Sequence, residues 1–498
     1  MRRVAALQFL LAFPAASLAA QASSLVLRDD PRLPLFEHLV MRGDIADPSP
    51  MWRPIKRRQV MESLTQGNAG TMGAKLIEAY TEAPIEKEGA KWEASGRAGM
   101  QSFTRARREL LQPAGAGGTR VYAEGGIIAR TKLAVLAARA AWEPRLSLDP
   151  DWIDTTSAEP RDEEWRILDG YVLTEGKGMS VSYGRYDRAW GMPGLSGLPA
   201  SADGYPLDAL AVSFQRGKLQ IDFSGAPLRQ VEDAIRPERY RYNTSHRFAF
   251  HPNAGLMLAF WETGIVSTES RNVLTTVASP FYPLVLAGIF SSSDDANTIE
   301  GADLSWRLGR PLLLQAQFAL DDAGSDEPED ARPARWGASL GLAGPLGGAL
   351  SWQARVTAAT SLLYRTHRPE EFYTDGTVGL GRNYADQVQA SVSLGIPVDG
   401  AWLFRPEITW LKQGEGNLRA PFPTGAELAA TPTFYIGTPA TTWRFGMSLS
   451  GQGGPVALSG TGGIHAVSNA GHVEGSSLTR FEGRIQATIG FSTGGRKK

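Results

Sequence analysis

Ser245, His246 and His251 are the residues whose types and spacing come nearest to a catalytic group. They lie in the stretch 244–253, which ends in Pro252-Asn253. A lipase of the Ser-His-Asn type would need a serine nucleophile, a histidine that takes its proton and an asparagine that orients the histidine. Pro252 separates His251 from Asn253, and no serine stands where the nucleophile motif of such a lipase requires one. We therefore expect no catalytic residue and no enzyme activity, and a barrel enzyme such as a lipase stays the second alternative.

Metal and phosphate chemistry also lack a matching pattern. The acidic cluster in the stretch 321–330 lacks the alternating ligands and the glycine of an EF-hand calcium loop. It fits a solvated loop, or a surface that contacts lipopolysaccharide or an anionic polymer through bridging cations. We expect no nucleophile elbow, zinc motif or phosphate loop, and thus no metal ligand and no cofactor. The cluster consists of Asp321, Asp322, Asp326, Glu327, Glu329 and Asp330.

Composition narrows the class of protein. The chain has 498 residues, with 51 Lys plus Arg, 52 Asp plus Glu and a formal net charge of −1. Nucleic-acid binding depends on a basic excess, so no nucleic-acid partner is expected. The 55 glycines suit a chain with many tight turns. Cysteine is absent, which excludes disulfides, thiolate metal sites and a lipid-modified N-terminal cysteine.

Residues 1–22 have the organisation of a secretory signal peptide. Two arginines follow Met1, an apolar stretch runs from Val4 to Phe13, and Ala20-Gln21-Ala22 forms a small-residue cleavage site. The apolar run is shorter than the ~20 residues of a spanning helix, and no later segment is long and apolar enough to be one. We expect an exported protein that could enter a membrane only as strands.

Two periodicities divide the rest of the chain. Between residues 25 and 88, apolar residues such as Leu35, Phe36 and Leu39 recur at helical spacing, which predicts a small helical region in the periplasm. From residue 89 to 491 the period is two. The segment that begins at Trp336, for example, is apolar on one face and carries glycine and serine on the other. The sequence thus predicts an all-β unit that follows the helices.

Alternation fits either a soluble β-sandwich or a transmembrane β-barrel. The stretch 89–491 has no linker and no second composition, and at about 10 residues per spanning strand it would form roughly 16–18 strands. So wide a barrel cannot fill its interior with apolar side chains, so its apolar faces must point to lipid. Aromatic residues at strand ends, such as Trp352 and Trp443, match interfacial girdles. We predict a large antiparallel outer-membrane β-barrel.

The other face of the predicted strands is polar and of mixed sign, which argues against a strongly charge-selective channel. Interior salt bridges that brace the wall are one interpretation, and a substrate path is the other. The residues concerned are Asp222, Arg307, Arg355, Arg405, Glu407, Arg444, Glu482 and Arg484.

The final predicted strand, from Phe481 to Phe491, has the clearest alternation. One face is apolar and ends in an aromatic residue, and the other carries Glu482, Arg484 and Gln486. The pattern resembles the C-terminal signal by which outer-membrane barrels are recognised for insertion. Residues 492–498 depart from that signal as a short polar tail.

The most distinctive segment leads from a strand into a loop rich in glycine and proline. It reads Tyr183-Gly184-Arg185-Tyr186-Asp187-Arg188-Ala189-Trp190-Gly191-Met192-Pro193-Gly194. It resembles the signature of the Wzi-type capsule assembly proteins, in which Gly-Arg leads to Trp-Trp-Gly-Pro-Gly. Ala189 in place of the first tryptophan and the extra Met192 are departures from that signature. A loop whose glycines and prolines only fix the backbone is the alternative.

The resemblance extends from about Leu33 to Phe491. It implies an outer-membrane, lectin-like barrel that helps to attach capsular or other exopolysaccharide to the cell surface. Arg185, Asp187, Arg188 and Trp190 are then the expected polysaccharide-binding residues, through hydrogen bonds to sugar groups and stacking on sugar rings.

The expected partners are this polysaccharide, outer-membrane lipid and lipopolysaccharide, and the expected state is a monomer. A channel or exporter for polysaccharide or small solutes is the first alternative function. Single-channel recordings would distinguish the two.

Overall fold

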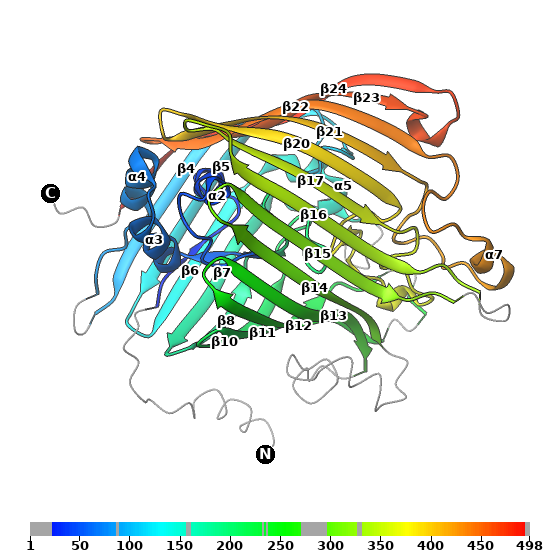
Figure 1. Ribbon diagram of the computed structural model, residues 1–498, viewed down its shortest axis with the longest axis horizontal. Helices are drawn as coiled ribbons and strands as arrows, with labels where there is room; N and C mark the ends of the chain where they lie inside the picture. Colours follow the sequence, from blue (N-terminus) through cyan, green and yellow to red (C-terminus); the bar gives the residue numbers. More distant parts are fainter. Residues whose placement is uncertain are drawn as a thin grey trace, which may run out of the picture.

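Among the residues that the structure describes, eighteen strands close into one antiparallel β-barrel (Figure 1). Neighbouring strands follow the order of the chain, and β24 pairs with β4 to close the wall. The predicted barrel of 16–18 strands is confirmed at its upper limit. This computed structural model describes residues 22–85, 89–155, 161–231, 234–235, 238–269, 296–325 and 331–493.

The barrel strands range from 7 residues in β8 to 17 in β24. Most reach the ~9–11 residues with which a tilted strand crosses a bilayer. Their bounds are β4 (Lys91–Phe103), β5 (Gly118–Arg130), β6 (Ala134–Trp142), β7 (Trp165–Gly176), β8 (Met179–Arg185), β10 (Asp208–Arg216), β11 (Leu219–Leu228), β12 (Tyr240–Asn253), β13 (Leu256–Thr268), β14 (Ala296–Leu308), β15 (Leu312–Asp322), β16 (Arg335–Pro345), β17 (Ser351–Ala359), β20 (Gln387–Val398), β21 (Trp402–Gln413), β22 (Ala440–Gly453), β23 (Val456–Ser468) and β24 (Ser477–Thr493).

The last strand, β24, shows how alternation orients the wall. Phe481, Ile489 and Phe491 are 62%, 66% and 69% exposed, whereas Glu482 is 2% exposed. Because side chains alternate across a strand, the apolar face points outward and the polar face into the lumen. The strand continues two residues beyond its predicted end, because β4 still offers backbone partners as far as Ala94.

The two ends of the barrel differ in the length of their connections. At one end, tight turns join the strands, such as Lys177-Gly178 between β7 and β8. At the other end the connections are long and carry short elements of their own. Outer-membrane barrels have their turns in the periplasm and their loops outside the cell. These ends are called the turn end and the loop end below. The long connections include 104–117, 143–164, 186–207, 360–386 and 414–439.

In the described part of the chain, three helices precede the barrel: α2 (Leu33–Arg42), α3 (Arg57–Gln66) and α4 (Gly70–Tyr80). α2 packs on β15, β16, β17, β21 and β22. Its Phe36 and Leu39 are buried in one apolar cluster with Leu313 and Leu403, which face the lumen near the turn end. The amphipathic period predicted for this region therefore serves to pack α2 on the inner wall. Residues 1–21, which carry most of the predicted signal peptide, lie outside the described residues.

None of the helices in the described part of the chain is long and apolar enough to cross a membrane.

The connection 186–207 crosses the lumen. Its β9 (Ala189–Trp190) pairs with β2 (Trp52–Arg53) of the N-terminal region. Further on, Leu198 N donates to Gln317 Oε1 of β15 at 2.7 Å, and Arg355 of β17 donates to the carbonyl oxygen of Gly194. In the closed strand order, β20 and β21 lie opposite β8 and β10, and β17 is the neighbour of β20. The segment therefore spans the barrel from one wall to the other.

Short elements complete the fold. Two more two-stranded sheets form, one from β1 and β3 and the other from β18 and β19. Helix α7 projects from the loop end (Figure 1). The bounds are β1 (Leu25–Val26), β3 (Ile55–Lys56), η1 (Pro144–Leu148), α5 (Pro150–Ile153), η3 (Pro369–Glu371), β18 (Thr374–Asp375), β19 (Val378–Gly379), α7 (Gly425–Ala430) and η4 (Ala470–His472).

Asp386, directly before β20, fixes the long connection that carries α7. Its buried carboxylate accepts hydrogen bonds from the backbone N–H groups of Tyr435 at 2.5 Å, Ile436 at 3.0 Å and Gly416 at 3.0 Å. One side chain thus holds both arms of the connection 414–439. Without it, three backbone donors would lose their acceptor.

We expect Asp386→Ala to loosen this connection and leave the barrel intact. A buried donor without a partner costs about 1–3 kcal/mol, so the amides that Asp386 binds should exchange hydrogen about 5- to 150-fold faster. Hydrogen–deuterium exchange with mass spectrometry would measure this. Asp399→Ala, in a turn at the opposite end, is the matched control. Unchanged exchange at residues 414–439 would contradict the assigned role.

Candidate functional site

Three of the four predicted polysaccharide-binding residues line one cavity, and the fourth lies apart. Asp187, Arg188 and Trp190 are lining residues of this cavity, whose free volume is about 80 Å³. Arg185, at the end of β8, is half exposed and forms an ion pair with Asp208 of β10 at 2.6 Å. The predicted set therefore divides into a cavity group and an ion pair between two strand ends.

The cavity lies near the loop end, inside the barrel wall. The connection 186–207 forms one side, and the β18–β19 hairpin contributes the stretch from Asp375 to Leu380. Strands β11 and β12 contribute Ser224, Asn243 and Ser245. Hydroxyl and amide groups of this kind can donate to and accept from sugar hydroxyls. The lining thus combines apolar surface with a few polar groups, as small-molecule sites do.

Trp190 is more enclosed than stacking on an external sugar would require. It is 3% exposed, and its ring centre lies 4.6 Å from that of Trp52. Its carbonyl oxygen accepts a hydrogen bond from Gln317 Nε2 at 3.2 Å. These contacts anchor the crossing segment, so packing accounts for much of what this tryptophan does.

Arg241 positions the hairpin that forms the opposite side. This arginine is 1% exposed, and it donates to the carbonyl oxygens of Glu370 at 2.7 Å, Phe372 at 2.7 Å and Thr374 at 3.0 Å. Arg229 also binds the hairpin, through the carboxylate of Asp375 at 3.0 Å. Arg229 lies in the connection between β11 and β12, and Arg241 lies in β12 itself. Both thus hold a hairpin that follows much later in the chain.

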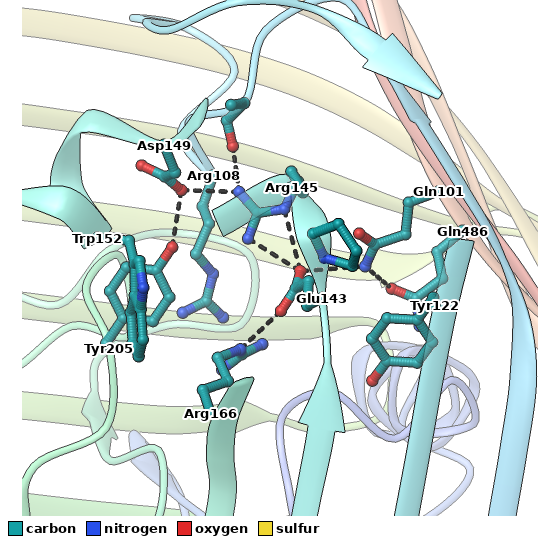
Figure 2. A network of polar contacts seen from close by, with 12 residues as sticks. Gln101, Arg108, Tyr122, Glu143, Arg145, Asp149, Trp152, Arg166, Tyr205 and Gln486 are labelled. Carbon is teal, nitrogen blue, oxygen red and sulfur yellow. Dashed lines mark hydrogen bonds and ion pairs between the residues drawn. The ribbon is translucent and has the colours of Figure 1, made fainter. Parts of the chain in front are cut away.

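A buried polar network supports the cavity from the side of β4 to β7 (Figure 2). Its centre is Glu143, whose carboxylate accepts from Arg166 Nε at 2.6 Å, Arg145 Nε at 3.0 Å and Gln101 Nε2 at 3.0 Å. Arg145 also pairs with Asp149 at 2.7 Å. Each buried charge therefore faces an opposite one.

Tyr205 connects this network to the cavity, which it also lines. Its hydroxyl donates to Asp149 Oδ2 at 2.7 Å, and Trp152 packs edge-on against its ring with a centroid distance of 4.7 Å. The guanidinium groups of Arg108 and Arg166 each lie 5.5 Å from the ring centre. A ring held in this way is positioned before any ligand arrives.

Three acidic groups of the connections 143–164 and 186–207 have shifted pKa values. Burial acts to raise the pKa of Glu143, but the charges of Arg166 and Arg145 dominate together and hold it well below its usual range. Burial raises the pKa of Asp151 to about 6, although its ion pair with Arg107 opposes the change. Burial also raises the pKa of Tyr205. Asp151 is thus the one of these groups that titrates near neutral pH.

The structure separates the residues considered for hydrolysis. Ser245 lines the cavity inside the barrel, and its hydroxyl bonds to that of Thr263 at 2.7 Å. The next residue, His246, belongs to the opposite face of β12, and its Nδ1 lies 2.6 Å from Glu262 Oε1. Because adjacent strand residues point to opposite faces, Ser245 and His246 cannot form a nucleophile–base pair.

The letters Gly-x-Ser-x-Gly do occur, from Gly337 to Gly341, although no nucleophile elbow was expected. An elbow needs a sharp turn from a strand into a helix. These residues instead lie inside β16, where the hydroxyl of Ser339 bonds to that of Thr357 on β17 at 2.8 Å. These five residues therefore match the letters of the motif without forming a nucleophile elbow.

Several of the interior charges predicted from the alternation form ion pairs. Arg355 pairs with Glu407 at 2.5 Å, and Arg444 binds the same carboxylate at 3.3 Å. The interpretation that such pairs brace the wall is confirmed for these three residues.

Part of the predicted acidic cluster is also neutralised. Asp321 and Asp322 both pair with Arg335, at 3.3 and 3.0 Å. Residues 326–330 of that cluster lie outside the described residues. The two described aspartates thus belong to an ion-paired strand end.

The sequence did not single out Arg229, Asp375, Asn243 or Tyr205 as site residues. Arg229 and Asp375 are 146 positions apart, and no motif connects them. The one available signal was the series of charged and aromatic residues within long loops, which many surface loops share. Only the folding of two loops into one lumen brings these residues together.

Comparison with known proteins identifies a family. The model of the capsule assembly protein Wzi family matches residues 86–393. A search of curated proteins gives no match to this sequence.

Several solved structures are similar to this chain. The Escherichia coli outer-membrane protein Wzi, involved in group 1 capsule assembly and described as a carbohydrate-binding β-barrel, superposes with a TM-score of 0.63 at 13% identity. The match covers 95% of this chain and 100% of that one. Pseudomonas aeruginosa OprD matches with a TM-score of 0.45 at 9% identity, over 82% of this chain and 97% of that chain. A BenF-like porin from Pseudomonas fluorescens Pf-5 gives 0.46 at 9% identity, over 82% and 99%.

Proposed function

Since the chain belongs to the Wzi capsule assembly family, we propose that it binds a capsular or other surface polysaccharide at the loop end and holds the polymer on the cell. Family and fold place the barrel in the outer membrane. The observation that carries the proposal is the cavity between the connection 186–207 and the β18–β19 hairpin, at the end that faces outward. The wall would contact lipid and lipopolysaccharide, and one chain would suffice as the working unit.

Binding would combine several modest contacts. Sugar hydroxyls would exchange hydrogen bonds with Ser224, Ser245 and Asn243, and Tyr205 also lines the cavity. Each such hydrogen bond adds only about 0.5–1.5 kcal/mol net. A long polymer that engages many copies of the protein would still be held firmly, because avidity multiplies weak contacts. No covalent step is needed for this role.

Deletion of the gene tests the role on the cell. We expect the polysaccharide to move from the cell pellet to the culture medium, with the total amount unchanged, because synthesis and export do not depend on a surface receptor. Quantification of polymer in both fractions measures this. Normal retention on the deletion strain would refute the proposal, and re-expression of the intact chain is the control.

Ser224→Phe tests the cavity itself. The larger ring would occupy space that the ligand needs, and we expect purified protein in detergent to bind the extracted surface polysaccharide roughly 10-fold more weakly. Thr479→Phe places the same ring on the exposed outer face near the start of β24 and serves as the matched control. Equal binding by both variants would show that the polymer is bound elsewhere.

A further inference from the structure

Arg188 stands out among the charged groups of the cavity because it has no ionic partner among the described residues. The other lining charges are accounted for: Asp375 pairs with Arg229 at 3.0 Å, and Asp187 lies 3.8 Å from Arg108 of another loop. Within the described part of the chain, the guanidinium of Arg188 makes two long hydrogen bonds, to the carbonyl oxygens of Leu207 at 3.4 Å and Gly184 at 3.5 Å. Its Nε is buried without any hydrogen-bond partner in the described structure.

Arg188 is also held in position. Its guanidinium carbon lies 3.6 Å from the ring centre of Tyr186. That ring is fixed in turn, because its hydroxyl bonds to Ser182 at 2.6 Å and its edge packs on Tyr171 at 5.5 Å. A planar guanidinium stacked on a fixed ring offers its N–H groups in a constant direction. The entropy cost of ordering the side chain has therefore been met before a ligand binds.

Arg161 adds a second positive charge to the surroundings. It lies on the ring of Trp152 at 4.5 Å, near Arg229, Asp375 and Arg185. No ion pair of its side chain occurs within the described parts of the chain. Burial, together with the neighbouring Arg229, lowers the pKa of Arg161. Arg188 and Arg161 are thus two guanidinium groups in this part of the barrel that have no ion pair among the described residues.

We propose that the sugar residue bound in this cavity is acidic and that Arg188 binds its carboxylate. This inference rests on the proposed function and adds the chemical class of the polymer, a polysaccharide that contains uronic acid or another carboxylated sugar. A carboxylate matches the forked N–H groups of arginine and would satisfy the buried Nε. A neutral sugar would leave that donor and the charge uncompensated, which is costly in a buried site.

Two preparations of one polymer test the chemical class. The surface polysaccharide extracted from cells that carry this gene is compared with the same material after its carboxyl groups have been reduced to primary alcohols. We expect intact protein in detergent to bind the native polymer roughly 10- to 100-fold more tightly than the reduced one, the range of a hydrogen bond to a charged group. Equal binding of the two would overturn the inference but leave the proposed function standing. Binding of neither would overturn both.

Variants then assign the contact. We expect Arg188→Gln to lower affinity for the native polymer to the level of the reduced polymer, without changing affinity for the reduced polymer itself. Arg188→Lys keeps the charge without the fork and should fall between the two. The control is Arg120→Gln, because Arg120 is exposed at the same end of the barrel and outside the cavity. An equal loss in both glutamine variants would indicate unspecific charge attraction and overturn the assignment.

Discussion

Replacing Glu143 with glutamine is expected to destabilise the barrel by about 3–5 kcal/mol, because it leaves buried guanidinium groups without their counter-charge. Glu143 is 3% exposed and binds Arg145, Arg166 and Gln101 at once. Arg145 would retain Asp149, but the described residues offer Arg166 no other ion pair. The loss in the free energy of unfolding should therefore exceed the loss caused by removing a surface salt bridge.

Urea unfolding of the protein in lipid vesicles at neutral pH measures this effect. The matched control is Glu62→Gln on α3, because the Glu62–Arg58 pair is exposed and its atoms lie 3.8 Å apart. A surface pair of this kind contributes about 0–1 kcal/mol. Equal unfolding midpoints for the two variants would contradict the central role of Glu143.

Arg166→Gln combined with Glu143→Gln extends the test. Removing both partners leaves less unpaired charge than removing one, so the double variant should lose less stability than the sum of the single variants. Purely additive losses would indicate that Glu143 acts through shape and not through charge.

The same carboxylate should give the barrel a characteristic acid response. The pKa of Glu143 is lowered in the fold, so the unfolded chain binds its proton at a higher pH than the folded chain does. Its contribution to the free energy of unfolding is complete above the unfolded pKa of about 4.3 and is lost as pH falls through the folded pKa. Glu143→Gln should remove this part of the pH dependence. If the free energy of unfolding of the variant depends on acid pH just as that of the original protein does, this role of Glu143 is refuted.

The barrel could be predicted because the same alternation of apolar and polar residues recurs in each strand along the chain. In β24, Phe481 and Phe491 must face one environment and Glu482 the other, and each further strand repeats that requirement. The bilayer then decides which face is outside, since a lumen of this width cannot be filled with apolar side chains. Register and closure follow from backbone pairing between neighbours in sequence, and this part of the fold is therefore present in the pattern of residue types.

The candidate site depends on contacts between residues whose spacing in the sequence follows no periodic pattern. The position of Asp375 depends on Arg241 and Arg229, which belong to another hairpin, and nothing in the spacing of these residues reveals it. Trp190 also shows that the sequence does not predict the contacts of a site residue. Its motif indicated an aromatic group free to contact sugar, yet the crossing segment turns its ring onto Trp52. The motif singles out the segment, but the direction in which its side chains point depends on the fold.

Arg188 is the exception, because it was singled out by its motif and lines the cavity. Its surroundings could not be predicted, since Leu207 and Tyr186 approach it only after the connection has folded inward. The absence of an ionic partner is a property of the folded lumen. The inference about an acidic sugar therefore required the structure.

The lumen should be closed to ions in the intact protein. The segment 186–207 crosses it near the loop end, and α2 lies against the inner wall near the turn end. The two obstructions lie in series, so their resistances add. We expect recordings in planar bilayers to show no sustained large currents, although open barrels of 16–18 strands carry an aqueous channel.

Deleting the crossing segment 186–207 should remove one of the two obstructions of the lumen. Arg185 and Asp208 are direct partners in the wall, so a short Gly/Ser linker in place of residues 187–206 can connect β8 to β10 without disturbing the strands. We expect this variant to show intermediate currents, because α2 still narrows the turn end. A variant that also lacks residues 25–85 should conduct at porin level. Slower migration after heating confirms that each variant retains a folded barrel.

Deletion of the exposed helix α7 is the matched control, because it shortens another connection at the same end with no buried residue. We expect it to stay silent. Large currents from the intact protein would instead favour the channel hypothesis and show that the crossing segment moves aside. Silence of the doubly shortened barrel would mean that other inward side chains close the lumen, with the paired charges of Arg355, Glu407 and Arg444 as the first to test.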